Sequence, residues 1–194
     1  MLEFLLDLDK QLFFFLNGLR HPWADPVMFL ISHKLSWIPL YVLLLVLVFK
    51  RYKMKGLMVL LFAVVLITLS DQGSVFVKNT FMRLRPCNDP ALEGLVQMVR
   101  RCPGGYSFVS SHATNTFALA IFMNLMLGLR FRFIVPVMIT YATLNAYSRI
   151  YLGVHYPSDV IFGSLLGIFV GWFVYFLWTQ LNKFLNKAGW WVES

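Results

Sequence analysis

The chain has 194 residues, of which 59% are hydrophobic and only 13% are charged. Soluble globular domains carry about 25% charged residues, so the composition excludes an ordinary soluble domain and predicts a single-domain polytopic membrane protein over residues 1–194. We attribute the net charge of +8 to residues that flank membrane spans and to a site for an anionic substrate. We do not attribute it to nucleic-acid binding, because no basic stretch lies outside the membrane-flanking loops.

The N-terminal segment, residues 1–20, is apolar but carries Asp7, Asp9 and Lys10 in its middle. Each of these charges would cost a membrane-spanning helix about 2.5–3.5 kcal/mol. We therefore predict an amphipathic helix that lies in the membrane interface, with a sixth span as the alternative. It has no basic n-region and no small-residue cleavage site, so we expect it to remain in the mature chain.

Five later segments are apolar enough to cross a bilayer, which takes about 20 residues of helix. They are residues 26–49, 56–79, 108–129, 131–150 and 158–182. The predicted fold is thus an all-α bundle of five to six transmembrane helices. Gly163, Gly167 and Gly171 in the last segment favour close packing against another helix. Their spacing does not say whether that helix belongs to the same chain or to a second copy, so the oligomeric state stays open.

Basic residues mark one end of these predicted spans. They are found in residues 50–55, in residues 130–132, and at Lys183 and Lys187. The positive-inside rule places such residues in the cytoplasm. The loop 83–107 and the connection 150–158 then lie on the extracytoplasmic face, although Arg100 and Arg101 in the first loop count weakly against this orientation.

Three clusters of polar residues fall on the predicted extracytoplasmic side. The first contains Lys78 and Arg85, which are seven residues apart and would share one helix face if the span continued to Pro86. Considered alone, they are better explained as ordinary cations whose long side chains reach lipid headgroups.

The second cluster, Ser110-Ser111-His112, stands where a span begins. Ser110 suits the N-cap position, which would leave the backbone N–H groups of Ser111 and His112 at an open helix end. Such an end binds anions through unpaired N–H groups and the helix dipole. The alternative is a simple capped helix with a buried neutral histidine.

The third cluster contains Arg149, His155 and Asp159. Pro157 fits the first turn of the last span, so Asp159 would lie in that turn and could reach back to His155. A carboxylate on Nδ1–H would leave Nε2 of the imidazole as a free nucleophile. The alternative is an aspartate that complements the helix dipole beside an unrelated histidine.

Together the clusters supply what phosphoryl transfer requires: cations for the phosphate oxygens, a nucleophile and an acid. The order K-x6-R-P, a P-S-G-H-like element and S-R-x5-H-x3-D resembles the signature of the type 2 phosphatidic acid phosphatase superfamily. Here the three motifs read Lys78…Arg85-Pro86, Ser110-Ser111-His112 and Ser148-Arg149…His155…Asp159.

This resemblance implies a role for each matching residue. His155 would attack phosphorus and become phosphohistidine, Asp159 would orient it, and His112 would protonate the leaving oxygen and then activate water. The phosphate would be held by Lys78, Arg85, Arg149, Ser110 and Ser111. The family needs no metal or other cofactor, so we expect activity in the presence of a chelator.

The middle motif departs from the family pattern at Ser111, where the family usually has glycine. A glycine lets the backbone approach the phosphate without an intervening side chain. The contact between Ser111 and the phosphate is therefore the weakest part of the resemblance.

The resemblance also implies a phosphorylated lipid as substrate, reached from within the membrane. Small family members of this shape suggest a bacterial plasma (inner) membrane protein that converts undecaprenyl diphosphate to undecaprenyl phosphate, with its site on the extracytoplasmic face. Lipid A phosphate and phosphatidylglycerophosphate are alternative substrates, and a lipid phosphotransferase is an alternative enzyme. A more distant alternative is a transporter that uses the intramembrane Asp71.

Cys87 and Cys102 bracket most of the outer loop. In an oxidising compartment a disulfide between them would stabilise the fold by about 3 kcal/mol through loop closure. Two free thiols remain the alternative.

Overall fold

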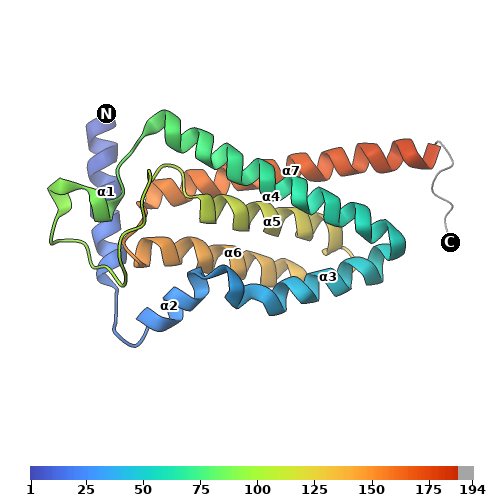
Figure 1. Ribbon diagram of the computed structural model, residues 1–194, viewed down its shortest axis with the longest axis horizontal. Helices are drawn as coiled ribbons and strands as arrows, with labels where there is room; N and C mark the ends of the chain where they lie inside the picture. The colour runs from blue at the N-terminus through green and yellow to red at the C-terminus, as the bar shows by residue number, and fades with distance from the viewer. Residues whose placement is uncertain (188–194) are drawn as a thin grey trace.

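The computed structural model describes residues 1–187, which form a helical bundle. Five helices run along its long axis (Figure 1): α3 (Ile38–Tyr52), α4 (Gly56–Phe81), α5 (Ser111–Leu127), α6 (Ile134–Tyr151) and α7 (Pro157–Lys187). The main core lies between them and includes fully buried side chains such as Leu66, Phe122 and Met138. The predicted all-α membrane fold is confirmed.

The first helix, α1 (Leu2–Gly18), lies crosswise at one end of the bundle (Figure 1). Apolar side chains such as Phe4, Leu8 and Phe15 are exposed on it, whereas Phe13 and Asn17 are buried against the bundle. Because α1 lies across the long axis of the bundle, its orientation supports an interfacial helix rather than a sixth span. The interfacial position itself stays a prediction.

The predicted continuous span over residues 26–49 is wrong in its first third. The structure has α2 (Asp25–Ser32), a 3-10 turn η1 (Lys34–Trp37) and then α3. His33 between them is extended, with φ −88° and ψ 125°. Because Pro39 lies in the first turn of α3 and has no N–H to continue a preceding helix, the chain starts a new helix there.

The helix α4 runs to Phe81, two residues past the predicted span over 56–79, and does not continue to Pro86. Met82 adopts a left-handed conformation, with φ 47° and ψ 30°, and its N–H caps the Lys78 carbonyl. Arg85 is extended, as expected for a residue before proline. Lys78 and Arg85 therefore do not share a helix face, because the helix does not continue to Pro86, which was the condition for it.

The glycine stripe of α7 packs against α5 of the same chain. A Cβ atom on Gly163 would lie 2.7 Å from the Ser110 carbonyl oxygen, and one on Gly171 would lie 2.6 Å from that of Ala118. A Cβ on Gly167 would overlap the carbonyl oxygen of Thr114. The glycines thus let two backbones approach closely, and the open question about their partner is answered for this stripe.

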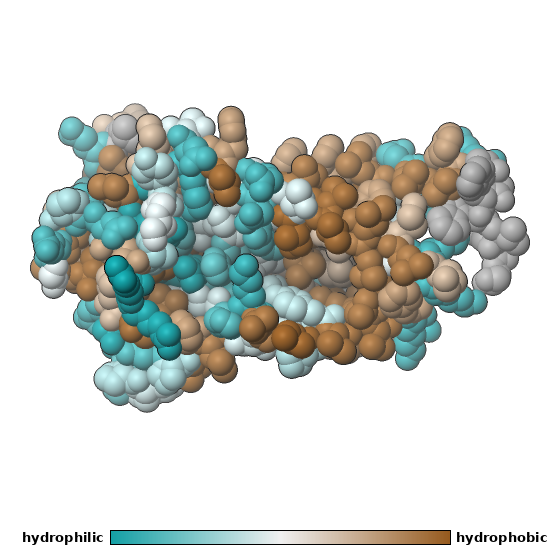
Figure 2. Space-filling view, viewed as in Figure 1, coloured by the Kyte–Doolittle hydropathy of each residue, from teal (hydrophilic) through white to brown (hydrophobic). Residues whose placement is uncertain are grey.

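Within residues 1–187, two stretches are long and apolar enough to cross a membrane: Lys34–Leu92, which contains α3 and α4, and Pro157–Lys187, which is α7. Figure 2 shows hydrophobic side chains gathered over the half of the bundle away from α1, along the long helices. Hydrophilic side chains cover the end at which α1 and the 82–110 connection lie. The basic turn η2 (Lys53–Lys55) and the end of α7 lie at the opposite end (Figure 1).

The long connection between α4 and α5 folds over the polar end of the bundle. It contains two 3-10 turns, η3 (Pro86–Asn88) and η4 (Pro90–Leu92), and Leu92 is buried in the same cluster as Phe13 of α1. Cys87 and Cys102 are joined by a disulfide within it.

Candidate active site

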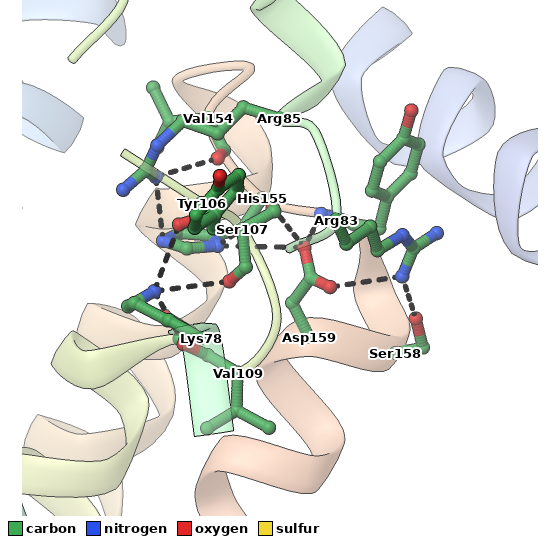
Figure 3. A network of polar contacts seen from close by, with 12 residues as sticks. Lys78, Arg83, Arg85, Tyr106, Ser107, Val109, Val154, His155, Ser158 and Asp159 are labelled. Atoms are coloured by element: carbon green, nitrogen blue, oxygen red, sulfur yellow. Dashed lines mark hydrogen bonds and ion pairs between the residues drawn. The ribbon is translucent and has the colours of Figure 1, made fainter. Parts of the chain in front are cut away.

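The centre of the site is His155, in the short connection between α6 and α7 (Figure 3). Arg85 Nη1 lies 3.0 Å from His155 Nε2, and an Asp159 oxygen lies 3.5 Å from Nδ1. Because a guanidinium only donates hydrogen bonds, Nε2 must be the acceptor and the ring proton belongs on Nδ1. Burial lowers the pKa of His155 to about 3. The imidazole is therefore neutral at pH 7, with a lone pair on Nε2, as the predicted role of nucleophile requires.

The carboxylate of Asp159 is fully buried and has a separate partner set on each oxygen. Oδ2 faces His155 and accepts hydrogen bonds from the Tyr156 N–H at 2.8 Å and from the Ser107 hydroxyl. Oδ1 accepts from Arg83 Nη1 at 2.9 Å. Each oxygen is thus fixed, which fixes the plane of the carboxylate against the histidine ring.

Arg85 reaches the site from an extended segment rather than from a helix. Its Nε is shared between the carbonyl oxygens of Gly104 and Gly105, each at 3.3 Å, and Nη1 also donates to Val154 at 3.0 Å. Only 8% of the residue is exposed. The outer connection therefore carries Arg85 into the bundle and clamps it beside Nε2.

Lys78 supports the loop that leads into α5. Its Nζ donates to the carbonyl oxygens of Val109 at 2.6 Å and of Tyr106 and Ser107 at 3.2 Å (Figure 3). An ammonium has three N–H donors, so these three carbonyl oxygens use all of the hydrogen-bond donors of Lys78. Lys78 is close enough to Arg85 and Asp159 for the charges to interact, and its phosphate contact stays a prediction.

The N-terminus of α5 is recessed within the bundle. Ser110 is its N-cap, as predicted, and the Ser110 N–H donates to the Asp159 carbonyl oxygen at 2.9 Å. Ser110 packs against Gly163, which is six residues into α7, or about 9 Å from its start. The start of α5 therefore lies deeper in the bundle than the start of α7.

Two buried atoms near this helix end have no hydrogen-bond partner. Among the described residues, buried side-chain atoms without a partner are Ser110 Oγ, Arg149 Nε and Asn124 Oδ1. The first two belong to residues predicted to hold phosphate. Because buried polar atoms are nearly always satisfied, they mark a place where an anionic group fits.

His112 and Arg149 line a pocket of about 340 Å³ together with Ser32, His33 and Lys34. Arg149 Nη1 donates to the hydroxyl of Ser32. His112 is close enough to Arg149, Arg85 and His155 for their charges to interact. The structure thus gathers all the predicted histidines, arginines and the aspartate at one end of the bundle.

A family model described as the PAP2 superfamily matches residues 54–183. The chain belongs to this superfamily. The predicted family is therefore confirmed, and the protein is a membrane lipid phosphatase.

Relatives and solved structures agree with this PAP2 assignment. The Lipid A 4'-phosphatase of Bacteroides thetaiotaomicron is 38% identical over 96% of this chain and 84% of its own. The Lipid A 4'-phosphatase of Porphyromonas gingivalis is 36% identical over 90% of this chain and 74% of its own. The crystal structure of Aquifex aeolicus LpxE has a TM-score of 0.67 at 29% identity and covers 86% of this chain and 94% of that chain. The same fold is found in a transmembrane PAP2 type phosphatidylglycerolphosphate phosphatase from Bacillus subtilis, which is 23% identical. Its TM-score is 0.69, and the match covers 91% of this chain and 87% of that chain.

Ser111, which stands where the PAP2 motif usually has glycine, has a hydrogen-bond partner on α4. The Ser111 hydroxyl pairs with Ser74 Oγ at 2.7 Å. Further along the same two helices, Asn115 donates to Asp71 at 3.3 Å. The serine side chain therefore faces α4, and the hydrogen bond of Asp71 favours a structural role over the transporter alternative.

Several residues of the PAP2 site lie outside the three sequence motifs and were not predicted. Ser107 bonds Asp159, Arg83 pairs with both Asp159 and Asp9, and Lys34 enters the pocket because the chain breaks between α2 and α3. Of these residues, only Arg83 could be noticed in the sequence, because it is a second arginine two positions before Arg85. The others depend on which loops meet in space, which the spacing of a single sequence does not give.

Proposed function

We propose that the protein hydrolyses a phosphate monoester on a lipid A-like glycolipid at the extracytoplasmic face of a bacterial inner membrane. The observation that carries the substrate is the 38% identity to a Lipid A 4'-phosphatase over 96% of the chain. The Undecaprenyl-diphosphatase of Sulfolobus acidocaldarius is 32% identical over 76% of the chain and 64% of its own. We therefore propose lipid A phosphate, which was an alternative in the sequence analysis, in place of undecaprenyl diphosphate, which was expected first.

The chemistry is derived from His155 and its partners. In the first step Nε2 attacks phosphorus, the bond from phosphorus to the lipid oxygen breaks, and His112 gives its proton to that oxygen. In the second step His112 takes a proton from water, the water oxygen attacks phosphorus, and the phosphorus–nitrogen bond breaks to release phosphate. Asp159 holds the Nδ1 proton, so it stabilises the cationic phosphohistidine that forms in between.

The phosphate oxygens have donors ready around Nε2. Arg85 Nη1 already lies 3.0 Å from that nitrogen, so a phosphate bound there would stay in reach of both groups. Ser110 Oγ and Arg149 Nε are two of the three buried side-chain atoms without a partner among the described residues. The helix dipole at the start of α5 adds further stabilisation for an anion. The bound phosphate dianion would also favour the protonated form that His112 needs as an acid.

Neighbouring pockets that share lining residues extend from this site along the bundle. A second pocket of about 390 Å³ shares Ser32, Lys34 and His112 with the first. A third, of about 270 Å³, lies between α3, α4 and α5 and shares Tyr41 and Leu119 with the second. The lining turns apolar with distance from His112, as expected if the phosphate enters at one end and an acyl chain follows.

The orientation rests on the two ends of the bundle. The basic turn η2 and the end of α7 lie at the end of the bundle opposite the start of α7 (Figure 1), so the positive-inside rule supports a site on the extracytoplasmic side.

The test is a turnover panel with purified protein in detergent: lipid A, undecaprenyl diphosphate and phosphatidylglycerophosphate, each with an added chelator. We expect kcat/KM to be highest for lipid A, and mass spectrometry to show which phosphate it loses. A clear preference for either other lipid would overturn the proposed substrate. Labelled phosphate transferred to a second lipid, without free phosphate, would instead identify a phosphotransferase.

A further inference from the structure

The face that α1 turns toward the bundle is built from residues four apart. Asp9, Phe13 and Asn17 lie on one side of the helix and are only 9%, 0% and 1% exposed. The apolar Phe4 and Phe15 are 69% and 65% exposed on other sides. Asp9 and Asn17 therefore face the protein together with Phe13, whereas Phe4 and Phe15 face outward, as expected of a helix that contacts both lipid and a polar site.

This face holds the connection that carries His155 at both of its ends. Before the histidine, Asn17 Nδ2 donates to the carbonyl oxygens of Ile150 and Tyr151 at 3.3 and 3.0 Å. After it, Asp9 accepts from the Ser158 N–H at 2.8 Å. The Phe13 ring also packs edge-on against Tyr156, with centroids 5.5 Å apart.

Arg83 extends this contact from α1 to the carboxylate beside His155. Its Nη2 lies 2.7 Å from Asp9 and its Nη1 lies 2.9 Å from Asp159 Oδ1. The guanidinium also stacks 3.9 Å over the Tyr156 ring. A planar fork is needed to reach both carboxylates at once, which arginine provides and lysine does not.

We propose that Asp9 and Arg83 are positioning residues for phosphoryl transfer. Asp9 fixes Arg83, and Arg83 holds Asp159 Oδ1 so that Oδ2 stays directed at Nδ1 of the nucleophile. The N-terminal helix at the lipid surface is thereby tied to the orientation of His155. The inference rests on the proposed role of His155, and it goes beyond the PAP2 match, which begins at residue 54 and leaves α1 out.

The expected signature is a loss in kcat with little change in KM. Arg83→Gln and Asp9→Asn should each lower kcat by roughly tenfold, as loss of an outer partner of a catalytic group commonly does. The phosphate donors Arg85, Arg149 and Ser110 are untouched, so KM should stay within about twofold. Because a smaller folded fraction would lower kcat in the same way, kcat is divided by the fraction of folded protein in each sample, measured from its melting curve.

Three further variants sharpen the test. Arg83→Lys keeps the charge without the fork and should recover only part of kcat. The double variant D9N/R83Q should be no slower than R83Q alone, because both changes break one chain of contacts. Asp7→Asn is the matched control on the same helix and should behave as wild type. Asp7 is exposed and, among the described residues, accepts a side-chain hydrogen bond from Gln11 alone.

His155→Ala in the same assay separates this inference from the proposed function. An inactive H155A with normal R83Q and D9N would overturn the positioning role alone, whereas an active H155A would overturn the histidine mechanism. If R83Q does not fold, D9N decides: normal kcat in a D9N protein with an unchanged melting temperature contradicts the proposal.

Discussion

At the scale of single residues, Ser110 and Ser111 are neighbours with opposite surroundings. Ser110 Oγ is buried without a partner, whereas the Ser111 hydroxyl is paired with Ser74 on α4. The proposed site therefore uses the first and not the second, although the family motif alone predicted both as phosphate ligands. The sequence showed that Ser111 departs from the family, but not where its hydroxyl points.

Alanine at each serine tests this difference. Ser110→Ala should lower kcat/KM by about tenfold or more, since it removes a donor aimed at developing charge. Ser111→Ala should cost about 1 kcal/mol of stability for its lost hydrogen bond and leave kcat/KM within about twofold. Equal kinetic losses in the two variants would show that Ser111 also contacts the phosphate.

The buried neutral His155 makes a prediction about pH. Its pKa is lowered to about 3 in the folded protein, whereas an unfolded histidine titrates near 6.5. Between these values the unfolded state binds a proton that the native state does not, so this residue makes stability fall as pH decreases from about 6.5. Nitrogen NMR of histidine-labelled protein, with the signal assigned by its loss in H155Q, should show a neutral ring protonated on Nδ1 from pH 8 to 5. An imidazolium signal at pH 6 would contradict the tautomer and the burial argument.

At the scale of helices, the existence of the long elements followed from hydropathy, and their ends did not. The segment 158–182 became α7, which runs from Pro157 to Lys187. The segment 108–129 became the shorter α5, whose start is recessed beside Gly163. Hydropathy averages over many residues, whereas the left-handed Met82 and the extended His33 that end α4 and α2 are single-residue events.

The packing of α7 on α5 gives a prediction with a built-in control. Gly167→Ala places a Cβ against the Thr114 carbonyl oxygen, so overpacking should cost about 1–3 kcal/mol and lower the melting temperature. Activity should fall too, because α5 carries Ser110 and His112. Gly73→Ala on α4 meets nothing within 4 Å and should be neutral or slightly stabilising. Indistinguishable melting temperatures for these two variants would rule out the close contact.

At the scale of the whole molecule, the polar end and the basic end lie at opposite ends of the bundle. The family and the lipid phosphatase activity could be inferred from three short motifs, because these residues must meet to handle phosphate. The substrate could not, because the pockets proposed to receive the tail are lined by residues from several helices, including Lys34 just after the unpredicted break at His33.

Orientation is testable by labelling introduced cysteines. Glu93→Cys lies on the exposed outer connection and Arg132→Cys on the exposed basic turn before α6. In cells with a permeabilised outer membrane, an impermeant thiol reagent should label the first and should reach the second only after lysis. The reverse pattern would place the site in the cytoplasm and contradict the positive-inside argument.

The claim that His155 is the nucleophile can be tested directly by trapping the intermediate. Protein mixed with phosphate-labelled lipid A, quenched in alkali within milliseconds and digested, should yield labelled phosphohistidine on the peptide that contains His155. His155→Ala should give no label and no turnover, whereas the control D7N should give the wild-type label. Full phosphate release by H155A, or label on another residue, would contradict the mechanism.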